Sequence, residues 1–238
     1  MAHPAMAPLP PLRQGDKLTS DEFLRRWEAM PDLKHAELLD GIVYCMPSPV
    51  LMSHSNSHID MGFWLSLYRD ATPGCDAGLE ATWVMSPKGV PQPDVHLIVL
   101  PEYGGQSGLT EKGYGGGAPE LIVEVTGSSR SRDLGVKLEL YCRAGVREYL
   151  TVLLKPQQVI WRQLIRGRYS EIAPGEDGLL RSVVFPGLWL DAEAVRSKKK
   201  SIRTAVEKGV KSPEHAAFVK RLTAAHKRKL KQKTAGPL

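Results

Sequence analysis

Runs of apolar residues divide the middle of the chain into predicted strands. Residues 94–100 and 119–125 are almost continuously aliphatic and β-branched, a pattern typical of strands inside a sheet. Residues 79–85 predict another strand, and residues 148–154 and 159–164 predict a pair joined through Lys155-Pro156-Gln157. These segments together predict a central sheet.

Two amphipathic stretches predict helices that pack on this sheet. From Ser53 to about Arg69, the apolar residues Ile59, Phe63 and Leu67 recur at helical spacing. A second helix is expected to end at Gly145, with Leu134, Leu138, Tyr141 and Cys142 on its buried face. The order strand, helix, strand over residues 120–154 indicates a crossover between parallel strands, and therefore a mixed sheet in an α/β (α+β) fold.

The N-terminal part predicts an arm, a helix and a hairpin. Residues 1–18 are proline-rich and are expected to be disordered. Thr19-Ser20-Asp21-Glu22 is typical of a helix start, and the helix should run towards Met30. Asp40-Gly41 separates two apolar segments within residues 36–46 and predicts a type I′ turn.

Other segments predict less regular structure. Residues 102–117 contain seven glycines, which predicts a mobile loop without regular elements. Residues 169–172 and 182–185 indicate short strands, and helices are expected at residues 192–210 and 213–231.

Charge divides the chain into an acidic body and a basic tail. Residues 196–238 hold 14 Lys and Arg against two Glu, about +12, which leaves 18 cations and 24 acids, about −6, in residues 1–195. We therefore expect a main domain at 19–191 and a basic helical C-terminal extension at 192–238. The extension fits contact with a polyanion such as nucleic acid, although for the tail considered alone a solvated lysine-rich helix is the preferred explanation.

Composition excludes several classes of protein. No segment approaches the roughly 20 apolar residues that cross a bilayer, and the N-terminus lacks an apolar signal core, so a cytoplasmic protein is expected. The three cysteines are widely spaced and form no CxxC pair, which argues against a disulfide framework or a thiolate zinc site.

Three residues carry candidate chemistry. Asp94 and Glu124 lie within the apolar strands, where a carboxylate must be neutralised by a cation, a proton or hydrogen bonds. Lys137 lies near the start of the following helix and could reach the same end of the sheet. Carboxylates that hold one or two Mg²⁺ ions, together with a fixed positive charge, suit hydrolysis of a phosphodiester.

Several motifs resemble one known family. Pro93-Asp94-Val95 and residues 117–125, 132–141 and 144–149 are similar to the bacterial putative restriction endonuclease domain family of the PD-(D/E)XK nuclease superfamily. Weaker likeness extends from residues 37–49 to residues 185–191 and 212–222. The resemblance implies a restriction-endonuclease-like mixed central sheet flanked by helices, with the active site at one end of the sheet.

The resemblance also implies roles for individual residues. Asp94 and Glu124 match the metal-binding acids, and Lys137 matches a lysine on the next helix that substitutes for the usual one. Thr126 stands where the superfamily motif has lysine, so activity depends on the reach of Lys137. Glu37 matches an early acid that could be an auxiliary metal ligand or simply an exposed hairpin residue.

Basic side chains near this site are candidates for nucleic-acid contact. His54 matches a recurrent histidine, and His54 and His58 have the spacing of a zinc pair but lack a third ligand. A polar, partly exposed helix start is the preferred interpretation; the alternative is that His54 contacts phosphate or supports the metal ligands. Arg130 and Arg132 follow Glu124 and could bind phosphate, or they could be ordinary solvated loop residues. Tyr141 and Tyr149 are interpreted as core aromatic residues.

These observations favour a Mg²⁺-dependent endonuclease that cleaves DNA through a metal-activated water. Mn²⁺ could replace Mg²⁺, and RNA or another phosphate-containing substrate stays open, as does a homodimer. The alternative is a catalytically inactive protein with the nuclease fold that binds nucleic acid, as Thr126 and the basic tail would allow.

Overall fold

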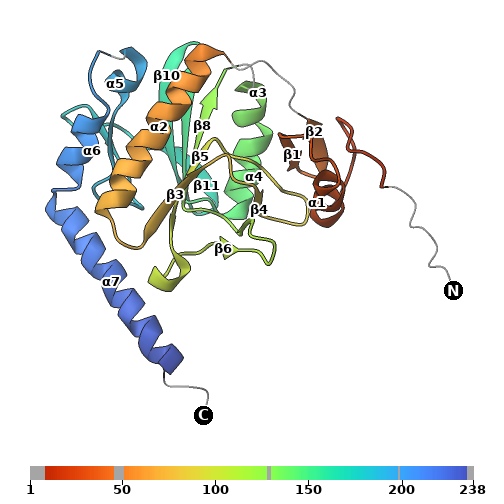
Figure 1. The fold of residues 1–238 in the computed structure, drawn as a ribbon. Helices are drawn as coiled ribbons and strands as arrows, with labels where there is room; N and C mark the ends of the chain where they lie inside the picture. The colour runs from red at the N-terminus through yellow and green to blue at the C-terminus, as the bar shows by residue number, and fades with distance from the viewer. Residues whose placement is uncertain (1–8, 46–50, 128–129, 198, 235–238) are drawn as a thin grey trace.

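A six-stranded mixed sheet forms the centre of the computed structural model, which describes residues 9–45, 51–127, 130–197 and 199–234 (Figure 1). Its strand order is β11-β10-β9-β8-β5-β3. Only the β8–β9 pair is parallel among the pairs of this sheet, as the crossover predicted. The strands are β3 (Cys75–Leu79), β5 (Val95–Val99), β8 (Leu121–Thr126), β9 (Glu148–Leu154), β10 (Gln157–Ile165) and β11 (Arg168–Glu171).

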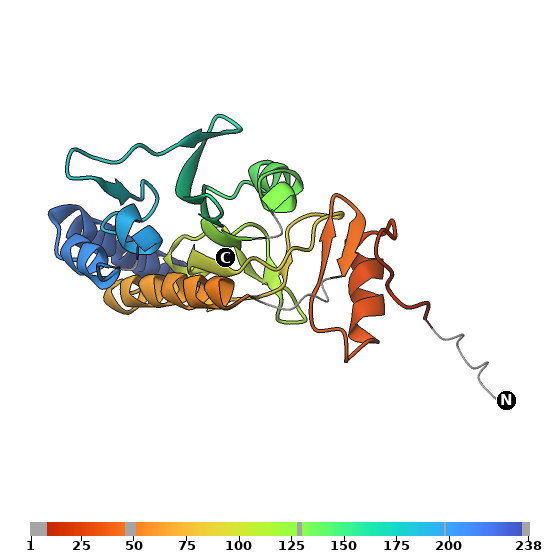
Figure 2. The ribbon, with the colours of Figure 1, turned by 90° about the horizontal axis from the view of Figure 1, so that it is seen from above.

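Helices cover both faces of this sheet. Helix α2 (Met52–Ala71) lies on one side and α4 (Val136–Ala144) on the other (Figure 2). The short helix α3 (Arg130–Asp133) precedes α4 within the crossover from β8 to β9. The fold is therefore the mixed α/β arrangement expected from the sequence.

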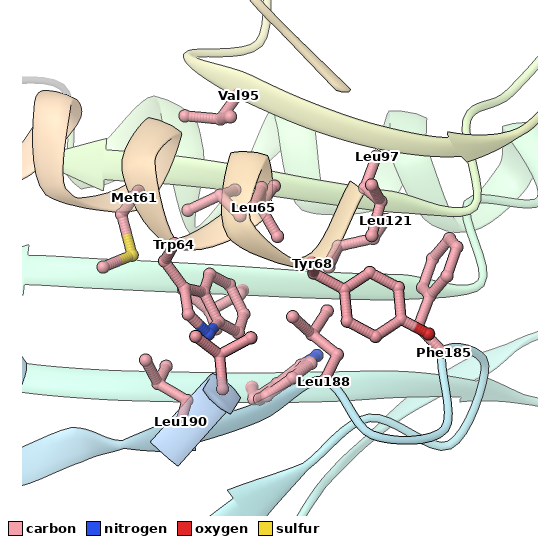
Figure 3. Packing of buried hydrophobic residues seen from close by; sticks show 14 of the residues in the cluster. Met61, Trp64, Leu65, Tyr68, Val95, Leu97, Leu121, Phe185, Leu188 and Leu190 are labelled. Carbon is pink, nitrogen blue, oxygen red and sulfur yellow. The ribbon is translucent and has the colours of Figure 1, made fainter. Parts of the chain in front are cut away.

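The buried face of α2 differs from the predicted one. Ile59 and Phe63 are 62% and 43% exposed, whereas Met61, Trp64, Leu65 and Tyr68 point into the core (Figure 3). The helix has apolar residues on two faces, and the larger aromatic rings are buried. Their polar atoms are also satisfied, because Trp64 Nε1 donates to the Trp189 carbonyl at 2.9 Å and Tyr68 Oη to the Pro186 carbonyl at 2.9 Å.

The N-terminal region packs as a small unit beside the sheet. Helix α1 (Ser20–Glu28) is capped by Thr19, and β1 (Ala36–Leu39) pairs with β2 (Ile42–Cys45) around Asp40 and Gly41, both at positive φ. The prediction of disorder is wrong for residues 9–18, because Leu12 is buried in the cluster that α1 and the hairpin form. Residues 1–8 and 46–50 lie outside the described residues.

The glycine-rich segment is more regular than predicted. It contains the 3-10 helix η1 (Pro101–Tyr103), β6 (Gly108–Leu109) and β7 (Gly115–Gly116), and β7 pairs with β4 (Trp83–Val84). A Cβ atom on Gly115 would lie 2.4 Å from the ring of Trp83. Here glycine permits close packing of two short strands rather than mobility.

The C-terminal helices belong to the main core. The predicted helix at 192–210 is two helices, α5 (Ala192–Ser197) and α6 (Arg203–Gly209), and α7 (Pro213–Thr234) follows. Phe218 and Leu222 of α7 are buried in the same cluster as α2, so the described part of the extension is no detached appendage. The predicted strand at 182–185 is a turn between β12 (Leu179–Arg181) and β13 (Trp189–Asp191).

Among the described residues, no helix has the length and apolar character needed to cross a membrane.

Candidate active site

The pairing of β5 with β8 brings the two candidate acids together. Val95 lies opposite Val123, so one further step of this antiparallel register places Asp94 opposite Glu124. Side chains alternate between faces, and Glu124 shares the α4 face with Ile122 while Val123 and Val125 face α2. The amide of Val125 donates to Asp94 Oδ2 at 2.6 Å and fixes that carboxylate.

Lys137 reaches this pair from the buried face of α4. That face consists of Lys137, Leu140 and Tyr141, whereas the predicted residues Leu134, Leu138 and Cys142 are only half-buried. The Lys137 Nζ atom lies 2.9 Å from Glu124 Oε1. The lysine charge therefore reaches the β8 acid although Thr126 occupies the usual lysine position.

Glu37 joins the same cluster from the N-terminal hairpin. Its side chain is fully buried, so the alternative of an exposed hairpin residue is wrong. Glu37 Oε1 lies 2.9 Å from Lys137 Nζ and accepts a hydrogen bond from the amide of Gln92 at 2.9 Å. Glu37 Oε2 is buried without a hydrogen-bond partner among the described residues. Because Gln92 is two residues before Asp94, the hairpin also positions the Asp94 segment.

Two further residues complete the cluster, and sequence reasoning missed both. Tyr141, interpreted only as a packing residue, donates its hydroxyl to Glu124 Oε1 at 2.7 Å. Asp133 accepts from Thr126 Oγ1 at 3.1 Å and lies 3.8 Å from Lys137 Nζ. The i, i+4 spacing of Asp133, Lys137 and Tyr141 was the signal that could have placed all three on one side of the helix.

The first turns of α2 bring histidines to the more open side of the cluster. His54 Nε2 lies 3.8 Å from Asp94 Oδ2, and these side chains are 26% and 18% exposed. His58 Nε2 lies 2.7 Å from the Asp94 carbonyl oxygen. Glu124 and Lys137 are each only 3% exposed, so Asp94 and His54 form the part of the cluster that solvent reaches.

Of the two arginines proposed to bind phosphate, the structure describes the side chain of only one. Arg132 lies with its guanidinium carbon 5.9 Å from the centre of the Tyr44 ring, and its Nε is buried without a partner among the described residues. The side chain of Arg130 lies outside the described part of the structure.

Burial and neighbouring charges shift the pKa values of the acids and of the lysine in this cluster. Burial raises the pKa of Asp94, and burial and the neighbouring acids raise the pKa of Glu124 well above its usual value, while Lys137 opposes both shifts. Burial alone would lower the pKa of Lys137, but the surrounding carboxylates outweigh burial and raise it. Lys137 therefore stays protonated, and it is the one cation that contacts Glu37, Glu124 and Asp133 among the described ion pairs.

The donor set fits a hard divalent cation. Within the described ranges, no group of three or more His, Cys, Asp or Glu side chains is placed to hold a metal ion. Mg²⁺ commonly takes only one or two protein carboxylates and completes its shell with water and substrate oxygens. The adjacent acids Asp94 and Glu124 could supply the one or two protein carboxylates that such an ion uses.

Comparison with known proteins identifies a family and a related structure. A family model described as "Uma2: Putative restriction endonuclease" matches residues 20–193. The crystal structure of a putative nuclease belonging to DUF820 from Anabaena variabilis matches with a TM-score of 0.52 and 15% sequence identity, over 80% of this chain and 98% of that one. No curated protein matches this chain.

Proposed function

Because the chain belongs to the Uma2 family of putative restriction endonucleases, we propose that it is a Mg²⁺-dependent endonuclease that hydrolyses phosphodiester bonds of DNA. The observation that carries this proposal is the buried, charged Lys137 held 2.9 Å from Glu124, which itself lies beside Asp94. A cation and two neighbouring acids at one end of a sheet are the groups that phosphodiester hydrolysis needs.

Asp94 and Glu124 would hold the ion, and Glu37 is an additional carboxylate of the same cluster. Bound Mg²⁺ supplies a positive charge for the phosphate oxygens and lowers the pKa of water. The chain itself prepares the two acids: the Val125 amide orients Asp94, and Tyr141 and Lys137 both donate to Glu124 Oε1.

Lys137 provides a fixed positive charge where negative charge develops on the reacting phosphate. Glu37 and Glu124 hold its ammonium between them, so little reorganisation is needed during the reaction. His54 lies 3.8 Å from Asp94 Oδ2 and is 26% exposed, which supports a role in contacting a phosphate group of the approaching strand.

The test is cleavage of supercoiled plasmid by the purified chain with Mg²⁺, with Mn²⁺ and with EDTA. We expect cleavage that requires the divalent ion and is lost in Asp94→Asn. The matched control is Asp76→Asn, which changes an exposed acid of β3. If wild type and Asp94→Asn cleave the plasmid equally, the proposed site is wrong. If neither protein cleaves the plasmid in a metal-dependent way, the proposed activity is wrong.

A non-catalytic function in nucleic-acid binding is the second candidate. Thr126 in place of the motif lysine and the basic helix α7 favour it. Helix α7 packs on η1, where His226 stacks on Tyr103 with ring centres 4.4 Å apart. Since η1 follows the far end of β5, α7 lies at the opposite end of the sheet from Asp94 (Figure 1).

The basic helix and the acid cluster can therefore be tested separately. Removal of the cationic side chains of α7 should lower salt-sensitive binding if α7 carries that function, without any need for Asp94. Duplex DNA, single-stranded DNA and RNA tested with one preparation separate cleavage from binding alone.

A further inference from the structure

A hollow opens beside the acid cluster at the same end of the sheet. It lies between the first turns of α2, the end of β9, the start of β10 and α5, and has a volume of about 350 Å³. Its floor is apolar and includes Val152, Val159 and Val195. Its polar lining includes Ser53, Asn56, Ser57, Lys155, Gln158 and Arg196. We call this hollow the α2–β9 groove.

Chain topology places the α2–β9 groove next to the candidate active site. Strands β8 and β9 are parallel, and Thr126 lies opposite Leu153, so both strands end at the same edge. Ser53 of the groove is the direct neighbour of His54, whose Nε2 lies 3.8 Å from Asp94 Oδ2. A strand bound at Asp94 can therefore pass over the start of α2 into the groove.

The lining is suited to an anionic ligand that also has an apolar surface. None of the described residues that line the groove is acidic, and Lys155 and Arg196 supply positive charge. Arg196 also pairs with Glu193 at 2.6 Å, but both side chains are well exposed and such a pair exchanges readily with solvent. The amides of Asn56 and Gln158 provide both donors and acceptors.

Ser57 adds a polar group to the interior of the groove. The residue is only 5% exposed and lines the groove. Its hydroxyl can both donate and accept a hydrogen bond, so it suits a polar ligand bound there.

We propose that the α2–β9 groove binds one unpaired nucleotide of the substrate strand, adjacent to the phosphate at Asp94. This proposal rests on the proposed function and deepens it. The groove volume of about 350 Å³ is at the low end of the roughly 300–1,000 Å³ of sites for single small ligands, which suits one nucleotide and not a base pair.

The apolar, amide and cationic residues of the lining each contact a different part of the nucleotide. The base lies on the valine floor with its edge at Asn56 and Gln158, and the phosphate lies at Lys155 and Arg196. The substrate class is therefore single-stranded or locally unpaired nucleic acid in preference to intact duplex.

The test measures binding in EDTA, so that cleavage plays no part. A labelled single-stranded oligonucleotide is titrated with the full-length chain, and fluorescence anisotropy gives the affinity. Lys155→Glu reverses an exposed charge of the groove, and Ser57→Leu fills its interior. Matched controls are Lys34→Glu, at an exposed position before β1, and Ser55→Leu, at an exposed position of α2, and circular dichroism confirms that each variant is folded.

We expect both groove variants to weaken binding by about five-fold or more, with a smaller salt dependence for Lys155→Glu, while both controls stay within about two-fold. Intact duplex of the same sequence should bind more weakly than the single strand and should be less sensitive to Lys155→Glu.

Three results would overturn the proposed nucleotide site. These are no oligonucleotide binding, unchanged affinity in Lys155→Glu, or duplex binding that is as tight as single-strand binding and is weakened as much by Lys155→Glu. The plasmid assay is read separately. If the groove variants weaken binding but the chain shows no metal-dependent cleavage, only the proposed nuclease activity is contradicted. If cleavage depends on Asp94 but binding does not depend on the groove, only the proposed nucleotide site is contradicted.

Discussion

The two ends of β8 both bury acids, but they neutralise them in different ways. At the start of β8 and β9, Glu120 accepts from the amides of Val99 and Gln106, and Glu148 accepts from Ser182 Oγ and the amides of Val183 and Val184. At the other end, Glu124 accepts from Lys137 and Tyr141 within a group of four acids.

The difference separates structural acids from candidate catalytic acids. Backbone amides hold Glu120 and Glu148 in place and tie loops to the sheet, so these acids have no need of a cation. The Asp94–Glu124 end instead groups four acids around Lys137, and the side chain of Asp94 is 18% exposed. Burial of an acid in an apolar strand is therefore a weak sign of catalysis, while a group of acids around one lysine is a stronger one.

Among the predictions, removal of the Lys137 ammonium group should have the largest effect on the free energy of unfolding. Lys137→Met leaves the buried carboxylates without their cation, and we expect a loss of about 3–5 kcal/mol in the free energy of unfolding near neutral pH. Urea denaturation measures it. The control Lys227→Met, at an exposed position of α7, should change stability by less than about 0.5 kcal/mol.

The same variant should show a characteristic pH dependence. The folded-state pKa values of Asp94 and Glu124 are already raised, and loss of Lys137 raises them further. A carboxyl group with a raised pKa stabilises the fold at pH values below its unfolded pKa, and this stability is lost as pH rises through the folded pKa. Lys137→Met should therefore be closest to wild type near pH 4 and furthest from it near pH 8; a loss independent of pH would contradict the charge argument.

Matched glutamine substitutions at the two ends of β8 should separate activity from stability. Glu124→Gln should lower metal-dependent cleavage by roughly 10²–10³-fold, about 2.7–4 kcal/mol, with a smaller effect on folding. Glu120→Gln replaces one acceptor oxygen with a donor facing a backbone amide, so it should cost about 1–3 kcal/mol of stability. Cleavage per folded molecule should stay close to wild type in Glu120→Gln. A similar loss of cleavage in both variants would remove the distinction between the ends.

Most strands of the sheet were predictable because each follows from a local pattern. The prediction of a strand at 79–85 is wrong, because these residues hold only the end of β3 and the short β4, which lies outside the six-stranded sheet. The continuous apolar runs gave β5, β8 and β9, and the intervening helix gave the parallel β8–β9 pair. The buried face of α2 was not predictable from spacing, because Ile59 and Phe63 fit a helical stripe as well as Trp64 and Tyr68 do. Only tertiary partners, such as the carbonyls of Pro186 and Trp189, decide between the two faces.

The candidate site was predictable in part for a similar reason. Asp94 and Glu124 could be paired once the strands were recognised, and the reach of Lys137 follows from its place in the first turn of α4. The position of Glu37 could not be derived, because it depends on how the N-terminal hairpin docks against α4. The same apolar context surrounds Glu148, so sequence alone gave no reason to treat Glu148 as structural and Glu124 as functional.

Added Mg²⁺ should stabilise the folded chain by binding at the Asp94–Glu124 end of β8 and not at the Glu120–Glu148 end. An ion that binds the folded chain at a concentration one hundred times its Kd adds about 2.7 kcal/mol to the free energy of unfolding. Thermal denaturation with Mg²⁺ and with EDTA should show this increase in wild type and in Glu148→Gln, but not in Asp94→Asn. An equal Mg²⁺ effect in Asp94→Asn would place the ion elsewhere.

Loss of one tyrosine hydroxyl near each end should give the smallest effects and a clear contrast. Tyr141→Phe removes the donor to Glu124, and Tyr68→Phe removes the donor to the Pro186 carbonyl, so each should cost about 1 kcal/mol of stability. A donor to a carboxylate lowers its pKa, so Tyr141→Phe should raise the apparent pKa of the Asp94–Glu124 pair. The acidic limb of the pH–rate profile for cleavage should then move to higher pH in Tyr141→Phe and stay unchanged in Tyr68→Phe. Identical profiles for the two variants would show that Tyr141 serves packing alone, because a purely structural hydroxyl has no means of shifting the titration of the acids.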